Sequence, residues 1–592
     1  MTASKYIMKF LVWRLKHISD NNFTLIVASL IGLIAGLAAV TLKSTVHFIQ
    51  HLLQQNLDIT KINYLYIVYP MIGILLTVIV RTYIVRDTPG HGITRILRAI
   101  SLNSSRIRKR YMVSNMLKSA ITVGFGGSVG LEAPIVVTGS AIGSNVGQFF
   151  HLDYKKRALL IGCGAAGAIS GIFNSPIAGV IFAIEVLMNE VKINKFIPIL
   201  IASVSGQLVS IVLLGEDILF SFKLTDSFAA EDTPFYMLLG VLCGLVSLYF
   251  TRTLFAAEGI IDKIKNNYIR AVVGGLGLAL IIFTFPPIYG EGYESIKSLL
   301  AGSEIHLLDS SLFYSFAENQ YIIILFLLLI IIVKPIASAF TIGAGGSGGV
   351  FAPSLFMGGV TGYLFSHVAN IVYPASKVSQ SNFTLVGMCG VLSGVLHAPL
   401  TGIFLIAEIT SGYMLFVPLM LVSAISFITI SYFEKHSIYT KRLIESGQLI
   451  RDDRDRMILN QINIKKIVEK DLLTIDPNAS LSELIKLVKK SKRNIFPVVN
   501  ENQELEGIVT LDDVREIMFD SEKQEAVVIK TLMHRPPDFV SPLEKMQSVM
   551  NKFEVTQAWN LPVIEDGKYL GFVSKARIFN AYRTKLIRQS RE

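Results

Sequence analysis

The sequence GFGGSVGLEAP at residues 124–134 and the sequence GAGGSGGVFAP at residues 343–353 are two copies of one glycine-rich pattern. Both copies end in Ala-Pro, and Glu132 of the first copy is replaced by Phe351 in the second. Glycine costs about 1 kcal/mol in a helix interior, whereas proline is favoured in the first helical turn. Each copy therefore predicts an extended or turning segment that leads into a helix start at its proline.

A second pair of matching segments follows. GAISGIFNSPIAGVIFAIEV at residues 167–186 matches GVLSGVLHAPLTGIFLIAEI at residues 390–409, in the same order and at nearly the same separation. The chain therefore contains duplicated halves. Duplicated transporter halves are commonly inverted, with the binding site between broken helices near the bilayer midplane. Glu185 and Glu408 occupy equivalent positions, and we expect both to be structural and to satisfy buried helix-end groups.

The composition is that of an integral membrane protein. Of 592 residues, 52% are hydrophobic and 17% are charged, whereas soluble domains average about 25% charged residues. Several apolar runs are long enough to cross the hydrocarbon core, and others are broken by Gly and Pro. We predict an α-helical polytopic membrane protein with inverted halves and broken helices. Basic clusters at residues 106–110 and 155–157 fit the positive-inside rule and help explain the net charge of +11; nucleic-acid binding is the disfavoured alternative.

The glycine-rich copies have the chemistry of an anion site. A helix start carries unpaired N–H groups and about half a positive charge, and glycine lets an ion approach the backbone. No full positive charge lies within either copy, which suits conduction because conduction needs weak binding at several sites. Glu132 imitates the anion: deprotonated, it plugs the path, and protonated or displaced, it leaves the path. The alternative is a structural helix cap.

Three motifs give the chain a family resemblance. GHGIT at residues 90–94, GLEAP at 130–134 and GVFAP at 349–353 resemble, in order, the anion-binding signatures of the CLC family of chloride channels and chloride/proton exchangers. The resemblance implies chloride as the transported ion, a homodimer with an anion path in each subunit, no enzymatic activity and no required cofactor. It implies Glu132 as the external gate. The implied anion-binding residues are Gly90, His91, Gly92, Gly130, Leu131, Gly349, Val350, Phe351 and Tyr439.

Departures from the family pattern bear on mechanism. Val186 stands where exchangers usually carry an internal proton-transfer glutamate, which favours passive, channel-like conduction over the alternative, proton-coupled chloride/proton antiport. His91 replaces a serine that contacts the anion; it either donates an N–H and makes transport pH-sensitive, or packs at a helix start. Thr94 replaces the usual proline of its motif. Pro134 and Pro353 are retained, which favours chloride over fluoride selectivity.

The chain changes character after the membrane region. We place an anion-transporting domain at residues 1–440, a linker at 441–460, and two similar α/β units at 461–522 and 523–592. Strand-like alternation and the hairpin sequence EDGK make these units similar to a cytoplasmic CBS-domain pair. The resemblance implies an adenine-nucleotide site, and the residues that fit it are Thr510, Asp513 and Ser574. Because Arg577 occupies the second Asp position, a purely structural dimerisation role is the alternative.

Two other classes of protein are weaker hypotheses. A CBS-bearing cation transporter predicts clusters of intramembrane carboxylates as ligands. A membrane-bound enzyme predicts a nucleophile with a base, or a cluster of metal ligands. The sequence offers isolated carboxylates and glycine-rich helix starts instead. We expect the protein to lie in a bacterial inner membrane, embedded in the lipid bilayer, with both termini cytoplasmic, and to move chloride with or without protons.

Overall fold

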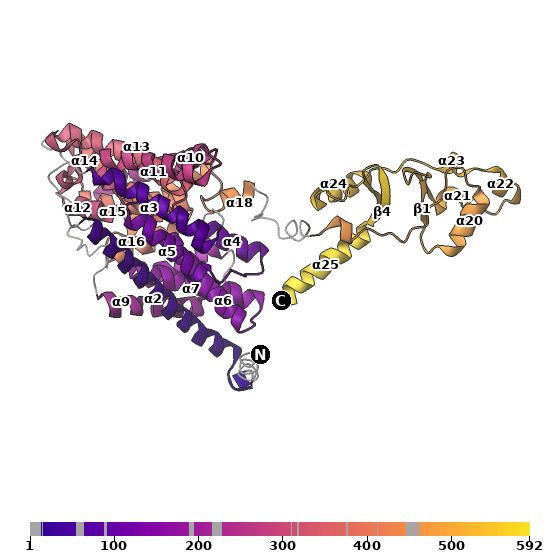
Figure 1. Cartoon of the computed structure of the whole chain (residues 1–592), viewed down its shortest axis with the longest axis horizontal. Coiled ribbons are helices and arrows are strands. Elements are labelled where there is room, and N and C mark those ends of the chain that lie inside the picture. Colours follow the sequence, from indigo (N-terminus) through magenta and orange to yellow (C-terminus); the bar gives the residue numbers. More distant parts are fainter. Residues whose placement is uncertain are drawn as a thin grey trace. The chain divides into compact units, whose positions relative to one another are not determined.

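The computed structural model divides into two compact units, Met1–Gln448 and Leu449–Glu592, each described by itself below. Figure 1 shows the helical first unit and the smaller α/β second unit. The structure describes residues 13–14, 16–54, 64–87, 92–188, 195–215, 226, 228–309, 311–316, 319–374, 377–410, 412–445, 459 and 462–591.

The first unit is built from apolar helices, as its composition predicts. Among the described residues, 9 helices are long and apolar enough to cross a membrane. These candidate membrane spans are formed by α2 (Asp20–Gln54), α3 (Leu65–Ile79), α7 (Tyr154–Phe173), α9 (Phe196–Leu214), α10 (Thr233–Ile261), α11 (Asn267–Thr284), α13 (Gln320–Gly343), α14 (Phe351–Val372) and α17 (Phe416–Phe433). The other α-helices of this unit with described bounds are α4 (Gly92–Leu102), α5 (Tyr111–Gly124), α6 (Glu132–Phe149), α8 (Pro176–Phe182), α12 (Tyr293–Leu300), α15 (Gln380–Leu396), α16 (Pro399–Ile409) and α18 (Lys441–Glu445).

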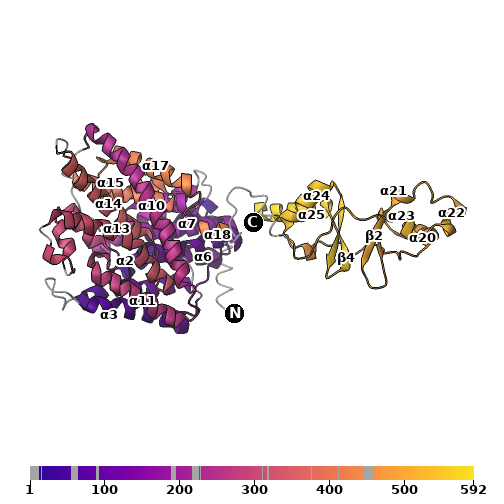
Figure 2. The same ribbon diagram turned by 90° about the horizontal axis from the view of Figure 1, so that it is seen from above.

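The duplicated halves pack in the same way. Helix α6 lies beside α7, and α14 lies beside α15 (Figure 1, Figure 2). A Cβ atom added to Gly139 on α6 would lie 2.1 Å from the carbonyl oxygen of Gly164 on α7. A Cβ added to Gly358 on α14 would lie 2.3 Å from that of Gly387 on α15. Glycine therefore permits the same close backbone approach at equivalent places in both halves, as is common between membrane helices.

Two carboxylates join the halves by capping each other's broken helices. Glu408, near the end of α16, accepts hydrogen bonds at 2.9 and 2.8 Å from the first free N–H groups of α8, those of Ile177 and Ala178. Glu185, just after α8, accepts bonds at 3.1 and 2.8 Å from the N–H groups of Leu400 and Thr401 at the start of α16. The predicted structural role of both glutamates is confirmed, and the exchange has the reciprocity that a local two-fold axis requires.

The second unit contains two similar α/β modules. The first has α20 (Leu481–Lys490), β1 (Ile495–Val499), β2 (Leu505–Thr510) and α21 (Leu511–Val514); the second has α24 (Met546–Thr556), β3 (Asn560–Glu565), β4 (Lys568–Ser574) and α25 (Lys575–Arg591). Between them lie α22 (Ser521–Ala526) and α23 (Ile529–Leu532). Each hairpin is antiparallel, and the predicted β3–β4 turn is confirmed, with positive φ at Asp566 and Gly567.

The packing of this unit crosses the predicted division at residues 522 and 523. The segment before the first module contributes Ile462, Ile464 and Ile467 to the core of the second. In return, Ile529 from the segment before the second module is buried in the core of the first. The sequence repeat divides the chain linearly, whereas the two cores exchange their leading segments.

Candidate functional site

The two glycine-rich segments meet in space. Gly130 and Gly349 form an antiparallel pair in which each N–H donates to the other's carbonyl oxygen at 2.8 Å. Helices α6 and α14 begin two residues later, at Glu132 and Phe351. The predicted helix starts are therefore confirmed in kind, although the prolines occupy the third position of the first turn.

This pairing changes what the glycines do. The N–H groups of Gly130 and Gly349 each donate to the carbonyl oxygen of the other glycine. In this arrangement they hold the two helix starts together. The first N–H groups of α14 have no partner inside their own helix. Val350 and Phe351 therefore supply the backbone donors at the start of α14. The Phe351 ring contacts Phe173, with ring centroids 5.4 Å apart.

A third helix start faces the same place. Gly92 begins α4, and Thr94 Oγ1 donates to the carbonyl oxygen of Tyr439 at 3.0 Å. Thr94, which stands at the family's proline position, thus ties α4 to the segment before α18. Gly90 and His91 lie outside the described residues.

A cavity lies among these helix starts. Its lining includes Gly92, Ile93, Thr94, Ala133, Leu254, Phe255, Ile342, Gly348, Gly349, Val350, Ile438 and Tyr439. The hydroxyl oxygen of Tyr439 is buried and finds no hydrogen-bond partner among the described residues. A buried hydroxyl rarely stays unpaired, so this group fits a ligand that accepts a hydrogen bond, such as an anion.

Glu132 lines a second pocket, and its neighbour Ala133 lines the cavity. Glu132 is the first residue of α6, its exposure is 1%, and its Oε1 accepts a hydrogen bond from the hydroxyl of Tyr293 on α12. Its Oε2 is buried, and the backbone N–H of Ala352 in the first turn of α14 also interacts with the carboxylate. A carboxylate at a helix start is favoured by the helix dipole, as a bound anion is.

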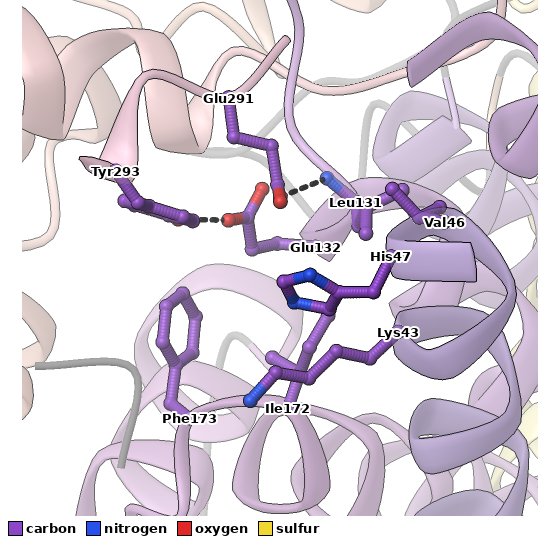
Figure 3. A pocket seen from close by; sticks show the side chains of 9 residues that line it. All are labelled: Lys43, Val46, His47, Leu131, Glu132, Ile172, Phe173, Glu291 and Tyr293. Atoms are coloured by element: carbon purple, nitrogen blue, oxygen red, sulfur yellow. Dashed lines mark hydrogen bonds between the residues drawn. The ribbon is translucent and has the colours of Figure 1, made fainter. Parts of the chain in front are cut away.

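The second pocket was not predicted from the sequence. Figure 3 shows its lining side chains: Lys43, Val46, His47, Leu131, Glu132, Ile172, Phe173, Glu291 and Tyr293. Glu291 Oε1 accepts a hydrogen bond from the N–H of Leu131 at 3.3 Å. That N–H belongs to the first glycine-rich segment, so a second carboxylate already holds one of its donors. The signal in the sequence was GEGY at residues 290–293, a carboxylate between glycines outside both repeats.

A lysine also lies closer to the glycine-rich segments than expected. Lys334, fully buried within α13, donates from Nζ to Ser128 Oγ at 2.9 Å and to the Ile288 carbonyl at 3.4 Å. Its Nζ also lies 4.6 Å from the centre of the Phe356 ring. Neither glycine-rich copy contains a positively charged residue, but the basic side chain of Lys334, from outside the copies, donates a hydrogen bond to Ser128 of the first copy.

The end of α4 nearest the anion motif is held by an ion-pair cluster. The Asp87 carboxylate is fully buried and accepts bonds from Arg95 at 3.0 Å, Tyr111 at 2.8 Å and Lys118 at 3.4 Å. Burial raises the pKa of Asp87, but the opposing effects of Arg95, Tyr111 and Lys118 together are larger, so the pKa of Asp87 lies below its usual value. The cluster fixes α4 against α5.

Val186 carries no ionisable group into the protein interior. It is buried in the π-helical turn Ala183–Leu187, next to the capping residue Glu185. The position expected to hold a proton-transfer carboxylate in exchangers is therefore apolar.

The predicted nucleotide-binding residues are engaged in local contacts. Thr510 Oγ1 donates to Asp513 Oδ2 at 2.7 Å in a capping box at the start of α21. Ser574 Oγ donates to Glu469 Oε1 at 2.6 Å, and Glu469 pairs with Arg493 at 2.6 Å. The structure places these hydroxyls at two helix starts, and the contacts of the described residues do not join Thr510 or Asp513 to Ser574.

Sequence comparisons identify the family. The pattern that defines voltage-gated chloride channels matches residues 72–431, more than half of the chain. The chain belongs to the CLC family. The CBS-domain pattern matches residues 464–520 and 529–584. The protein is thus a membrane protein of the CLC family, which transports anions, and it carries a C-terminal CBS pair.

Individual relatives of this CLC protein include channels and exchangers by name. The chloride channel protein CLC-f of Arabidopsis thaliana is 27% identical over 72% of this chain, which spans 60% of that protein. The H(+)/Cl(-) exchange transporter ClcA of Vibrio parahaemolyticus is 26% identical over 76% of this chain and 98% of its own length. A eukaryotic CLC transporter structure has the same fold, with a TM-score of 0.59 at 20% identity, covering 94% of this chain and 97% of its own.

Proposed function

We propose that this CLC protein conducts chloride passively through a path in each subunit, with Glu132 as the gate. The observation that carries the proposal is the place of the Glu132 carboxylate. It lies at a helix start, lining the pocket that contains Lys43 and His47, while the neighbouring Ala133 lines the cavity that contains Tyr439. An anion that follows this route meets the carboxylate as a competitor for the same positive helix end.

The proposed chloride ligands are donors of partial charge. They are the N–H groups of Val350 and Phe351 at the start of α14 and the hydroxyl of Tyr439, which lines the cavity together with Val350. On the pocket side, Leu131 offers its N–H once an entering anion displaces Glu291 from it. Weak donors of this kind bind an ion without trapping it, which conduction requires. The retained prolines at 134 and 353 support chloride rather than fluoride as the ion carried.

Passive conduction is proposed over antiport because Val186 cannot carry a proton. Proton-coupled chloride/proton antiport is the second candidate, and it is favoured by the name of the Vibrio relative, an H(+)/Cl(-) exchange transporter. The two candidates share the anion path and differ in whether protons move against their gradient.

The experiment is chloride efflux from proteoliposomes with proton movement recorded at the same time. Passive conduction predicts chloride efflux only when an ionophore for a cation shunts the voltage, with no uphill movement of protons. Uphill proton movement under a chloride gradient would replace the channel proposal with antiport. Absence of any chloride flux across a range of pH would remove both.

We also propose a homodimer in a bacterial inner membrane, with both termini on the cytoplasmic side. The basic residues at 106–110 and 155–157 support the orientation through the positive-inside rule. Subunit counting in bilayers tests the dimer, and cysteine labelling of either terminus from one side of the membrane tests the orientation.

For the CBS pair, we propose binding of an adenine nucleotide at Thr510, Asp513 and Ser574. The two hydroxyls lie at helix starts, which suit phosphate groups. Binding requires Asp513 to exchange its bond to Thr510 for a bond to ribose. Equilibrium dialysis with ATP tests the proposal: binding lost in Asp513→Asn supports it, and no binding to the unaltered protein leaves the structural dimerisation role.

A further inference from the structure

The segment that links α11 to α12 is bound to the first glycine-rich segment along its length. Ser128 Oγ donates to the carbonyl oxygen of Ile288 at 2.9 Å, and the N–H of Gly290 donates to the carbonyl oxygen of Gly126 at 3.2 Å. Nearer the gate, Glu291 accepts the N–H of Leu131. The segment therefore carries its own side chains to the gate in a fixed register.

Glu291 of this segment and Tyr293, the first residue of α12, reach the gate. The hydroxyl of Tyr293 donates to Oε1 of Glu132, while the half-buried Glu291 lines the same pocket. Figure 3 shows the Glu291 and Glu132 carboxylates on one side of the pocket, with His47 and Lys43 projecting from α2 on the other. Glu132 is thus one of two carboxylates in one small site.

Two carboxylates in a site of low dielectric constant do not both ionise freely, because each charge disfavours the other. The groups facing them come from every element around the pocket. Lys43 and His47 lie on α2, Tyr293 lies on α12, and Lys334 lies on α13, bonded to the same linking segment through Ile288. His47, which lines the pocket, is exposed, so the pocket reaches the surface of the first unit on this side.

We propose that Glu291 is a positioning residue of the gate, whose negative charge, held on the Leu131 N–H, sets the pH at which Glu132 takes up a proton and releases the anion path. This inference rests on the proposed gating role of Glu132. A charged Glu291 favours the protonated, open form of Glu132 by repulsion. It also occupies the Leu131 N–H, so an entering anion must displace it there. Removing the charge of Glu291 makes Glu132 harder to protonate, so the path stays closed until the pH falls to a lower value.

The test is the rate of chloride efflux from proteoliposomes as a function of pH on the side of this pocket. Glu291→Gln keeps the shape of the side chain and an oxygen acceptor for Leu131. We expect its half-activation to move to lower pH by about one unit, the size of a nearby charge effect, with the rate at low pH preserved. Glu291→Asp, which keeps the charge, should return the profile toward that of the unaltered protein.

The matched control is Glu294→Gln. Glu294 lies three residues further on, its side chain is exposed and it pairs with Lys297, so its replacement should leave the pH profile unchanged. Glu132→Gln should be insensitive to pH, and adding Glu291→Gln to it should change nothing further.

The outcomes separate the two claims. If Glu291→Gln superimposes on the unaltered profile while Glu132→Gln abolishes the pH dependence, the role of Glu291 is refuted and the gate stands. The role is also refuted if Glu291→Gln still shifts the pH profile when Glu132 is already glutamine. If Glu132→Gln leaves the pH dependence intact, the gate itself fails, and the role of Glu291 with it.

Discussion

Replacing Gly349 by alanine places a methyl group where the two halves of the protein touch. The added Cβ would lie 2.6 Å from the Cβ of Ala133 and 3.2 Å from its backbone nitrogen. These atoms belong to the backbone and a methyl group at the start of α6, so no flexible side chain can move aside. Ordinary contact requires about 3.5 Å, and the two helix starts must therefore separate by about 1 Å.

The separation acts directly on the anion site. The paired 2.8 Å hydrogen bonds between Gly130 and Gly349 are stretched, and the donors at the starts of α6 and α14 no longer converge. A hydrogen bond to a charged group contributes about 1.5–3 kcal/mol. Loss of one such bond weakens chloride binding by about 10- to 100-fold.

The assay is isothermal titration of the purified protein with chloride, supported by chloride efflux from proteoliposomes. Gly259→Ala is the matched control, because Gly259 is exposed on α10 and an added Cβ there meets nothing within 4 Å. We expect the control to bind chloride like the unaltered protein. A folded Gly349→Ala protein that binds chloride within twofold of the unaltered protein would refute the claim that the glycine pair builds the site.

Three other predictions concern the supports of the site. Glu408→Ala removes two charged hydrogen bonds from the start of α8 and should lower the stability to unfolding by about 3–5 kcal/mol; an unchanged thermal midpoint in detergent would contradict the capping role. Asp87→Asn should cost about 3 kcal/mol at pH 7. Because the folded pKa of Asp87 lies below its unfolded value of about 3.9, this difference should be constant above about pH 5 and shrink progressively as the pH falls below 4. A difference at pH 3 as large as that at pH 7 would contradict the role of the charge. Tyr439→Phe removes a hydroxyl without a partner among the described residues, so stability should hold while chloride binds about fivefold more weakly, worth about 1 kcal/mol; equal affinity by calorimetry would exclude the hydroxyl as a ligand.

The repeat allowed much of the fold to be predicted from the sequence. Two glycine-rich copies ending in proline predict two helix starts, and the duplication predicts that they meet. The equivalent positions of Glu185 and Glu408 predict equivalent roles, which their reciprocal caps confirm. Such features are local patterns repeated in the chain, so they are visible without knowing how the chain folds.

The parts that escaped prediction come from segments with no repeat. Lys43, Glu291, Tyr293 and Lys334 lie on three separate segments, and only folding brings them to the first glycine-rich copy. The pairing of Gly130 with Gly349 was also hidden, because a glycine pattern does not say whether its N–H groups face an ion or another backbone. In the CBS pair, the exchange of leading segments between cores has no signal in a linear repeat.

The most direct test of the central claim is the chloride affinity of Glu132→Gln, measured by calorimetry beside the unaltered protein and Glu294→Gln. If the Glu132 carboxylate competes with the anion for the helix start, its neutral replacement should bind chloride at least about tenfold more tightly at neutral pH, the value of one charged hydrogen bond. Glu294→Gln should match the unaltered protein. Equal chloride affinity in all three proteins would contradict the account, because Glu132 would then not occupy the path of the anion.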